Sequence, residues 1–165
     1  MHLLPSLVLL SSLVLIHGYQ SSTALSDKFY GKFTLDHSEN FDEYLEAKGY
    51  SWFTRKLIVF ATFEKIFEKV KDSTFNYENL TTKKNVYYKN VTLGQKFTGE
   101  GLDSSPRAII FDMKDGHLLE KHVPIYPYSE VEEEEYEYYF DGDFLVIKME
   151  ANGVVGKRFY KRVVA

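Results

Sequence analysis

The stretch DGDFLVIKMEANGVVGKRFYKR, residues 141–162, decides the fold class of this chain. It contains two turn signals, Asp141-Gly142 and Asn152-Gly153, and such pairs favour the tight turns of β-hairpins. Side chains of a strand point alternately to its two faces. Between the two turns, one face of the predicted strand carries Leu145, Ile147 and Met149. The stretch therefore predicts two consecutive hairpins of antiparallel strands.

From about Lys65 onward, the chain before this stretch also consists of strand-like runs separated by turn signals. Runs rich in Tyr, Phe, Val, Thr and Ile recur between turn signals, and Asp115-Gly116 is a third tight turn. No long helical pattern separates these runs, so parallel crossovers are not expected. The pattern predicts an antiparallel meander, which removes its exposed edges most simply by closing into a barrel.

One short helical region precedes the strands. Helical spacing relates Phe41, Tyr44, Leu45 and Lys48, and Gly49 ends the pattern. We expect Asp36 or Ser38 to cap this helix, with Asp36 and Glu39 forming a capping box. A second short helix is predicted from Ser51 or Trp52 to about Phe60.

The last predicted strand carries cations on both of its faces. One face holds Val154, Gly156, Arg158, Tyr160 and Arg162, and the other holds Val155, Lys157, Phe159 and Lys161. A strand that packs a dry core usually has one hydrophobic face. An arginine and a tyrosine inside a barrel need a hydrogen-bond acceptor, either water or a carboxylate. Arg158 and Tyr160 are therefore candidate ligand-binding residues, and a structural pair that holds water is the alternative.

The first 18 of the 165 residues are predicted to be a secretory signal peptide. Their uncharged apolar run, LLPSLVLLSSLVLI, is short for a membrane span, although an uncleaved anchor is the alternative. Residues 19–26 are a short lead, and residues 27–165 form the predicted barrel domain. Asn79 and Asn90 lie in glycosylation sequons, consistent with a secreted protein. A formal net charge of −4 opposes a nucleic-acid partner.

Residues 31–49, GKFTLDHSENFDEYLEAKG, resemble the signature of the fatty-acid-binding, or intracellular lipid-binding, protein family. The shared features are a Gly-x-aromatic start followed by Asn40-Phe41-Asp42 and Tyr44-Leu45. The segments FTRK, LGQKF and KRFYKR are similar to family segments and follow in the same order. The leader, the ENLTTKK segment and a longer segment before DGDFLV resemble the secreted nematode branch of the family.

The resemblance implies an all-β fold, a ten-stranded antiparallel up-and-down β-barrel with a two-helix lid near the N-terminus. It implies a long-chain fatty acid, or a retinoid or similar small lipid, in a partly hydrated cavity. An Arg-x-Tyr on the last strand of the family binds the carboxylate, which corresponds to Arg158 and Tyr160. A second family arginine has no counterpart, and Tyr138 or Tyr139 stands in its place. The family also meets membranes transiently through its lid.

The segment LIVFATF, residues 57–63, follows the place where the family has its second helix and portal. Its apolar side chains are candidates for lining the portal or contacting the acyl chain, namely Leu57, Phe60 and Phe63. A plain core strand has the same composition, so that alternative stays open.

Enzymatic chemistry has no motif to support it. The chain has no cysteine, no Gly-x-Ser-x-Gly elbow, no phosphate loop and no His-Glu-x-x-His, so we expect no catalytic residue and no cofactor. The acidic run Glu132–Glu135 is predicted to be a solvated hairpin tip and not a metal site. The sequence predicts a secreted, monomeric lipid carrier. The alternative is an extracellular interaction protein with an inert barrel, recognisable by a side-chain-filled interior and an exposed apolar patch elsewhere.

Overall fold

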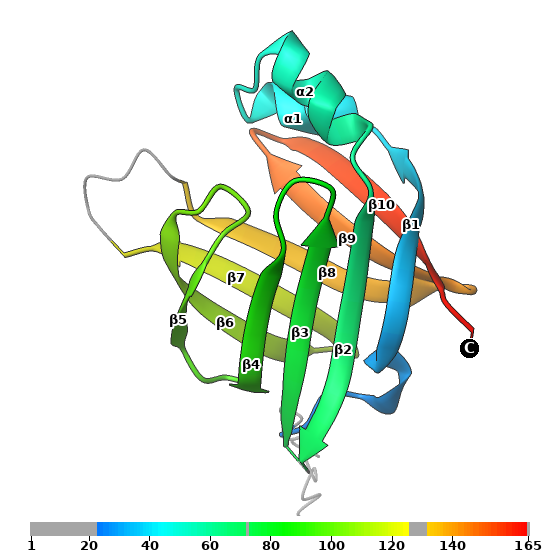
Figure 1. Ribbon diagram of the computed structural model, residues 1–165, viewed down its shortest axis with the longest axis vertical. Coiled ribbons are helices and arrows are strands. Elements are labelled where there is room, and N and C mark those ends of the chain that lie inside the picture. The colour runs from blue at the N-terminus through cyan, green and yellow to red at the C-terminus, as the bar shows by residue number, and fades with distance from the viewer. Residues whose placement is uncertain (1–22, 72, 126–131, 165) are drawn as a thin grey trace, which may run out of the picture.

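A computed structural model describes residues 23–71, 73–125 and 132–164, which form one antiparallel sheet rolled into a nearly closed barrel (Figure 1). A 3₁₀ turn, η1 (Asp27–Phe29), comes before the first strand. The strands are β1 (Gly31–Glu39), β2 (Phe63–Lys71), β3 (Thr74–Thr81), β4 (Val86–Thr92), β5 (Phe97–Glu100), β6 (Pro106–Lys114), β7 (His117–Pro124), β8 (Glu134–Asp141), β9 (Phe144–Ala151) and β10 (Val154–Arg162). Two helices, α1 (Phe41–Ala47) and α2 (Trp52–Val59), connect β1 to β2.

The strand order is β4-β3-β2-β1-β10-β9-β8-β7-β6-β5. Strands that follow one another in the chain therefore lie side by side, and the pairing of β1 with β10 joins the beginning of the meander to its end. This arrangement confirms the predicted ten-stranded barrel with its two-helix lid. Because β4 and β5 stand at the two ends of the order, they form the one junction of the described sheet without ladder pairing.

The predicted hairpin turns are present, but they are not all alike. Asp115 and Gly116 have φ of 52° and 80°, and Asn152 and Gly153 have φ of 49° and 78°. Positive φ at both central residues defines the type I′ turn that suits the twist of a hairpin. In the turn between β8 and β9, by contrast, Gly142 has a φ of 55° while Asp141 remains in the strand.

The predicted cap of the first helix was wrong. Asp36 and Ser38 both lie in β1, where Ser38 pairs with Arg158 of β10 and Asp36 falls at a β-bulge or irregularity of the ladder between Leu35 and His37. The residue before α1 is Asn40, in the left-handed region with a φ of 51°, and its side chain makes no cap. Instead, its Nδ2 donates to the carbonyl of Val155 at 2.8 Å. The second helix is confirmed within one residue, and Ser51 caps it by accepting from the Thr54 amide at 3.3 Å.

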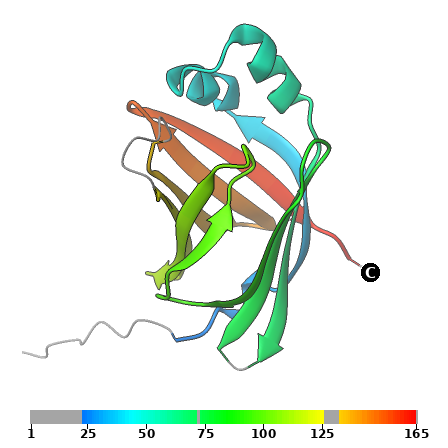
Figure 2. The same ribbon diagram turned by 60° about the vertical axis from the view of Figure 1, so that its left-hand side comes forward.

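The two helices cover one end of the barrel, and they are held very differently (Figures 1 and 2). Helix α1 buries Phe41, Tyr44 and Leu45. It approaches β10 at Gly156, where an added Cβ would lie 2.8 Å from the Tyr44 Cβ. Helix α2 buries only Arg55. The lid therefore consists of one anchored helix and one largely exposed helix.

Aromatic side chains from the inward faces of the strands, together with Phe29 of η1, occupy the barrel interior. Those with exposed fractions below 2% are Phe29, Phe33, Phe67, Phe75, Tyr77, Phe111, Tyr138 and Tyr160. Several meet edge to face, as the rings of Phe75 and Phe111 do at 5.7 Å and 87°. Such packing adds to the stabilisation that burial of these rings provides.

Candidate functional site

Arg158 and Tyr160 both lie on the inner face of β10, as the sequence predicts. The guanidinium carbon of Arg158 lies 3.8 Å from the ring centroid of Phe63 and 4.3 Å from that of Phe41. Arg158 is only 4% exposed, and burial lowers its pKa. Its Nε and Nη2 are buried and have no hydrogen-bond partner among the described residues. The site thus holds a cation with cation–π contacts and two unused donors.

The two tyrosines proposed in place of a second arginine lie on opposite faces of β8. Tyr138 is buried in the interior, where its hydroxyl donates to Glu120 and lies 3.0 Å from the Tyr77 hydroxyl. Tyr139, the next residue, points to the outer face, where its ring stacks on that of the half-exposed His117 with 5.2 Å between the ring centroids. Only Tyr138 therefore belongs to the interior network, and its proton is already directed to Glu120.

The interior also contains a charged group that the sequence reasoning missed. Glu120 and His122 lie on the inner face of β7, 3% and 5% exposed, with 2.7 Å between Glu120 Oε1 and His122 Nε2. A signal was present in the sequence, because both residues are in phase with the core residue Leu118. Polar residues at the inward positions of a predicted strand therefore indicate a buried polar site on β7, as they do on β10.

Lys65 extends this network from the opposite side of the barrel. Its Nζ donates to the Tyr77 hydroxyl at 2.9 Å, and the residue is 7% exposed. Burial lowers the pKa of Lys65 to about 8, and the positive charge of Arg158 adds to this effect while Glu120 opposes it. A continuous chain of polar contacts therefore runs from β2 through β3 and β8 to β7.

In the acidic run Glu132–Glu135, predicted to be solvated, Glu132, Glu133 and Glu135 are exposed, but Glu134 is not. Its side chain is 15% exposed, and it forms ion pairs with Lys48 at the end of α1 and with Arg107 Nη1, the latter at 3.1 Å. Arg107 is also paired with Asp103 at 2.8 Å. Glu134 is the first residue of β8, and its side chain lies on the same face of the strand as the buried Tyr138. Arg107 is buried like Arg158, but it has two acidic partners, whereas Arg158 has none among the described residues.

The three portal candidates occupy different environments. Phe63 is 8% exposed and packs against Arg158, whereas Leu57 and Phe60 are 60% and 83% exposed. Trp52 and Phe53 of α2 are 65% and 66% exposed. Helix α2 thus presents an apolar surface, defined by Trp52, Phe53, Leu57 and Phe60, to the outside of the lid.

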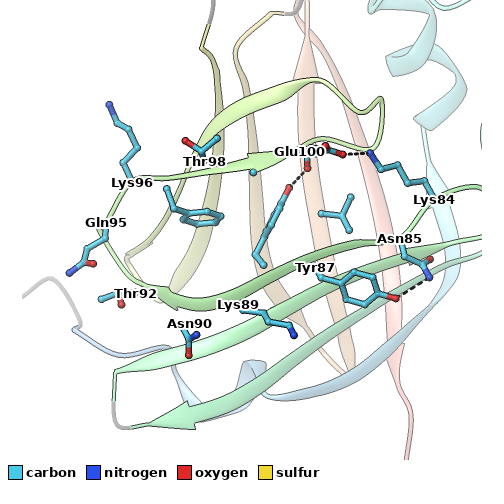
Figure 3. A pocket seen from close by; sticks show the side chains of 14 residues that line it. Lys84, Asn85, Tyr87, Lys89, Asn90, Thr92, Gln95, Lys96, Thr98 and Glu100 are labelled. Atoms are coloured by element: carbon cyan, nitrogen blue, oxygen red, sulfur yellow. Dashed lines mark hydrogen bonds and ion pairs between the residues drawn. The ribbon is translucent and has the colours of Figure 1, made fainter.

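The unpaired junction of β4 and β5 forms a groove of about 460 Å³ in the barrel wall (Figure 3). Side-chain contacts bridge it, since the Tyr88 hydroxyl donates to the Glu100 carbonyl at 2.7 Å. Lys84 forms an ion pair with the Glu100 carboxylate at 2.8 Å. Lys89 and Lys96 also line the groove. Side chains therefore connect β4 and β5 at the junction where no backbone ladder joins the two strands.

The remaining predicted sites fall partly outside the described residues. The signal peptide lies there entirely. Asn79 pairs with Lys65 in the β2–β3 ladder and its Oδ1 is buried, whereas Asn90 is exposed. In the described ranges, no three His, Asp or Glu side chains are grouped so that they could hold a metal, and no helix has the length and apolarity needed to cross a membrane.

The fold and this interior define a class of protein, the lidded ten-stranded β-barrels with a buried polar site. Fatty acid-binding protein homologs 1 and 2 of Caenorhabditis elegans are 58% and 61% identical to this chain over 152 and 140 residues. The matches cover 92% and 84% of this chain, and 95% and 86% of the relatives. This chain belongs to the fatty-acid-binding protein family.

A solved structure agrees with this assignment. As-p18, an extracellular fatty acid binding protein, superposes with a TM-score of 0.80 at 44% identity, covering 85% of this chain and 99% of its own. A Schistosoma mansoni fatty acid binding protein in complex with arachidonic acid has a TM-score of 0.69 at 22% identity, over 86% of this chain and 100% of its own. That likeness shows the fold alone. A scan of protein-family models matched none.

Proposed function

We propose that this protein is an extracellular carrier of long-chain fatty acids and similar small lipids. In this proposal, Arg158 and Tyr160 hold the ligand carboxylate. The observation that carries the proposal is the buried Arg158 guanidinium, whose Nε and Nη2 lack partners in the described part of the chain. A buried cation without an anionic partner is costly, and a carboxylate matches the guanidinium fork with two parallel hydrogen bonds. The names of the similar proteins support the same ligand class.

The acyl chain, and not the head group, is expected to set the affinity. Burying a methylene contributes about 0.8 kcal/mol, so a chain of about 16 carbons gains on the order of 10 kcal/mol before costs. A charged hydrogen bond contributes roughly 1.5–3 kcal/mol. Because interior rings are packed closely, the acyl chain must displace them as it enters. Retinol has a hydroxyl in place of the carboxylate and cannot give Arg158 a charged, two-fold hydrogen-bonded partner, so we expect it to bind more weakly than oleate.

Replacing Arg158 with leucine should weaken oleate binding by roughly ten- to hundredfold, because it removes the charged hydrogen bonds and leaves the acyl-chain contacts. The measurement is a titration of the delipidated chain, from residue 19 onward, with a fluorescent fatty acid that oleate then displaces. Lys157→Leu, on the outer face of the same strand, is the matched control and should bind as the wild type does. A loss above about a thousandfold in a folded Arg158→Leu protein would show that the head group dominates.

The apolar surface of α2 is proposed to contact membranes transiently while the lipid is transferred. Trp52 and Phe53 begin the helix, Leu57 lies one turn later and Phe60 directly follows the helix, so these exposed apolar side chains lie together on one short segment. Aromatic side chains are favoured at the membrane interface. Lys56, in the last turn, adds a positive charge that attracts anionic lipid.

The double variant Phe53→Ser, Phe60→Ser should transfer bound fluorescent fatty acid to vesicles several-fold more slowly, with its affinity for oleate unchanged. The vesicles contain phosphatidylcholine and phosphatidylserine, and the transfer rate is followed at increasing vesicle concentration. Val70→Ser, a change of an exposed valine on β2, serves as the control. A wild-type rate that is independent of vesicle concentration would show that transfer occurs through free ligand instead.

Secretion, glycosylation and a monomeric state are further parts of the proposal. The apolar leader and the extracellular relative support secretion. Asn90 is the better glycan acceptor because it is exposed, whereas the Asn79 Oδ1 is buried. A monomer is favoured because, in the described sheet, only β4 and β5 have free edges, and side chains bridge that junction.

Two observations favour the alternative, an extracellular interaction protein with an inert barrel. The interior aromatic side chains are almost fully buried, and α2 carries an exposed apolar surface. The oleate titration separates the two functions. If the folded, delipidated wild-type protein binds neither oleate nor retinol, the interaction protein becomes the better description and the carrier is excluded.

A further inference from the structure

We propose that Glu120 and His122 form a second polar subsite inside the barrel, which binds a hydroxyl group on the chain of a fatty acid. The inference rests on the proposed carrier function and specifies a class of ligand, the hydroxylated long-chain fatty acids. The observation behind it is a buried imidazole nitrogen that lacks a hydrogen-bond partner among the described residues. His122 Nδ1 is buried and has no hydrogen-bond partner in the residues that the structure describes, although the other ring nitrogen is bonded to Glu120.

The bond to Glu120 determines the chemistry of the free nitrogen. Burial raises the pKa of Glu120, but the hydrogen bond and charge of His122 and the charge of Lys65 together hold it below its ordinary value. An ionised carboxylate only accepts hydrogen bonds, so Nε2 carries a proton. Nδ1 is then an acceptor in the neutral ring and a donor in the protonated ring. A hydroxyl satisfies both forms, whereas a carbonyl or carboxylate oxygen serves only the protonated form.

The side chains around the ring do not supply that hydroxyl. The rings of Tyr136 and Tyr88 lie 5.6 Å and 6.4 Å from the imidazole. The Tyr136 hydroxyl donates to Glu134, and the Tyr88 hydroxyl donates to the Glu100 carbonyl. The protons of both nearby hydroxyls are therefore directed elsewhere, and in this proposal the partner of Nδ1 is a hydroxyl of the bound ligand.

The positions of the two polar sites indicate where the ligand carries its hydroxyl. Arg158 is on β10 and His122 is on β7, with β9 and β8 between them in the sheet. Three strand spacings of about 4.8 Å amount to roughly 14 Å along the wall. No hydrogen bond or ion pair among the described residues joins Arg158 to His122, so in this proposal the two side chains bind separate groups of the ligand. The second group therefore lies several methylenes along the chain, as in a fatty acid hydroxylated near its middle.

Oleate and ricinoleate form a matched pair for the test, since they differ in one mid-chain hydroxyl. We expect the wild-type protein to bind ricinoleate about three- to tenfold more tightly than oleate, as one buried hydrogen bond allows. His122→Phe keeps an aromatic ring at this position but removes both nitrogens. The preference for ricinoleate should therefore vanish while oleate still binds. Tyr139→Phe, on the outer face of β8, controls for the loss of an aromatic polar group and should keep the preference.

A measurement on the wild-type protein covers the case in which His122→Phe does not fold. Nitrogen NMR of histidine-labelled protein should show the His122 Nδ1 resonance shifting with ricinoleate and not with oleate. Equal affinity of the wild type for the two acids, or an unchanged preference in His122→Phe, would overturn the subsite and leave the carrier intact. Failure of both acids to bind the folded wild type would overturn the carrier proposal as well.

Discussion

Replacing Glu120 with leucine should lower the free energy of unfolding by about 3–5 kcal/mol, the usual cost of removing one partner from a buried charged group. The change leaves His122 Nε2 and the Tyr138 hydroxyl without their acceptor. It also removes the only described carboxylate that raises the pKa of the buried Lys65. Urea denaturation followed by tryptophan fluorescence and circular dichroism measures the effect.

Glu133→Leu is the matched control for this experiment. Glu133 is paired with Lys121 at 2.5 Å, but it is 53% exposed, and exposed pairs contribute only about 0–1 kcal/mol. Equal unfolding free energies for the Glu120 and Glu133 variants would show that the interior network does not contribute to stability. Glu120→Gln should fall between them, because the amide retains an acceptor oxygen while the charge is lost.

The contribution of Glu120 should depend on pH in a definite direction. Its pKa is held below the ordinary value of 4.5 in the folded protein, so the stabilisation is present above that value. It is lost as the pH falls through the folded-state pKa, because the unfolded chain then binds the proton more readily. The wild type should consequently lose more stability than Glu120→Leu does as the pH falls below 4.5.

Replacing Phe67 with alanine should also cost about 3–5 kcal/mol of unfolding free energy, because it removes a buried ring and leaves a space that its neighbours fill incompletely. Phe67 is 1% exposed, and its ring lies 5.0 Å from that of Tyr77 and 6.0 Å from that of Tyr138. The same denaturation experiment applies. Phe53→Ala on α2, where the ring is 66% exposed, should change stability by less than about 0.5 kcal/mol.

The same variant tests how the interior receives an acyl chain. Because Phe67 occupies space that a ligand needs in the carrier proposal, Phe67→Ala should retain oleate binding despite its lower stability. Tight oleate binding combined with a large loss of stability would mean that the ring fills space and does not hold the ligand. A stability close to that of Phe53→Ala would contradict the packing seen around Phe67.

The sequence predicts the barrel well because its strongest signals are local. The turn at Asn152-Gly153 and the alternation of Leu145, Ile147 and Met149 depend only on neighbouring residues, and the structure confirms the hairpins. The inward direction of Arg158 follows from the same alternation. The cap at Asp36 failed because a competing interaction comes from far along the chain, where β10 pairs with β1.

The sequence by itself therefore determined the meander, the two helices and the inward face of the last strand, since turns and alternation act within a few residues. Only the tertiary structure decided which charges meet inside. It brings Lys65, Tyr77, Tyr138, Glu120 and His122 together from four strands. It also pairs Arg107 with acidic groups while leaving Arg158 without one in the described chain. These pairings depend on how the closed sheet places distant strands across its interior, which no local pattern encodes.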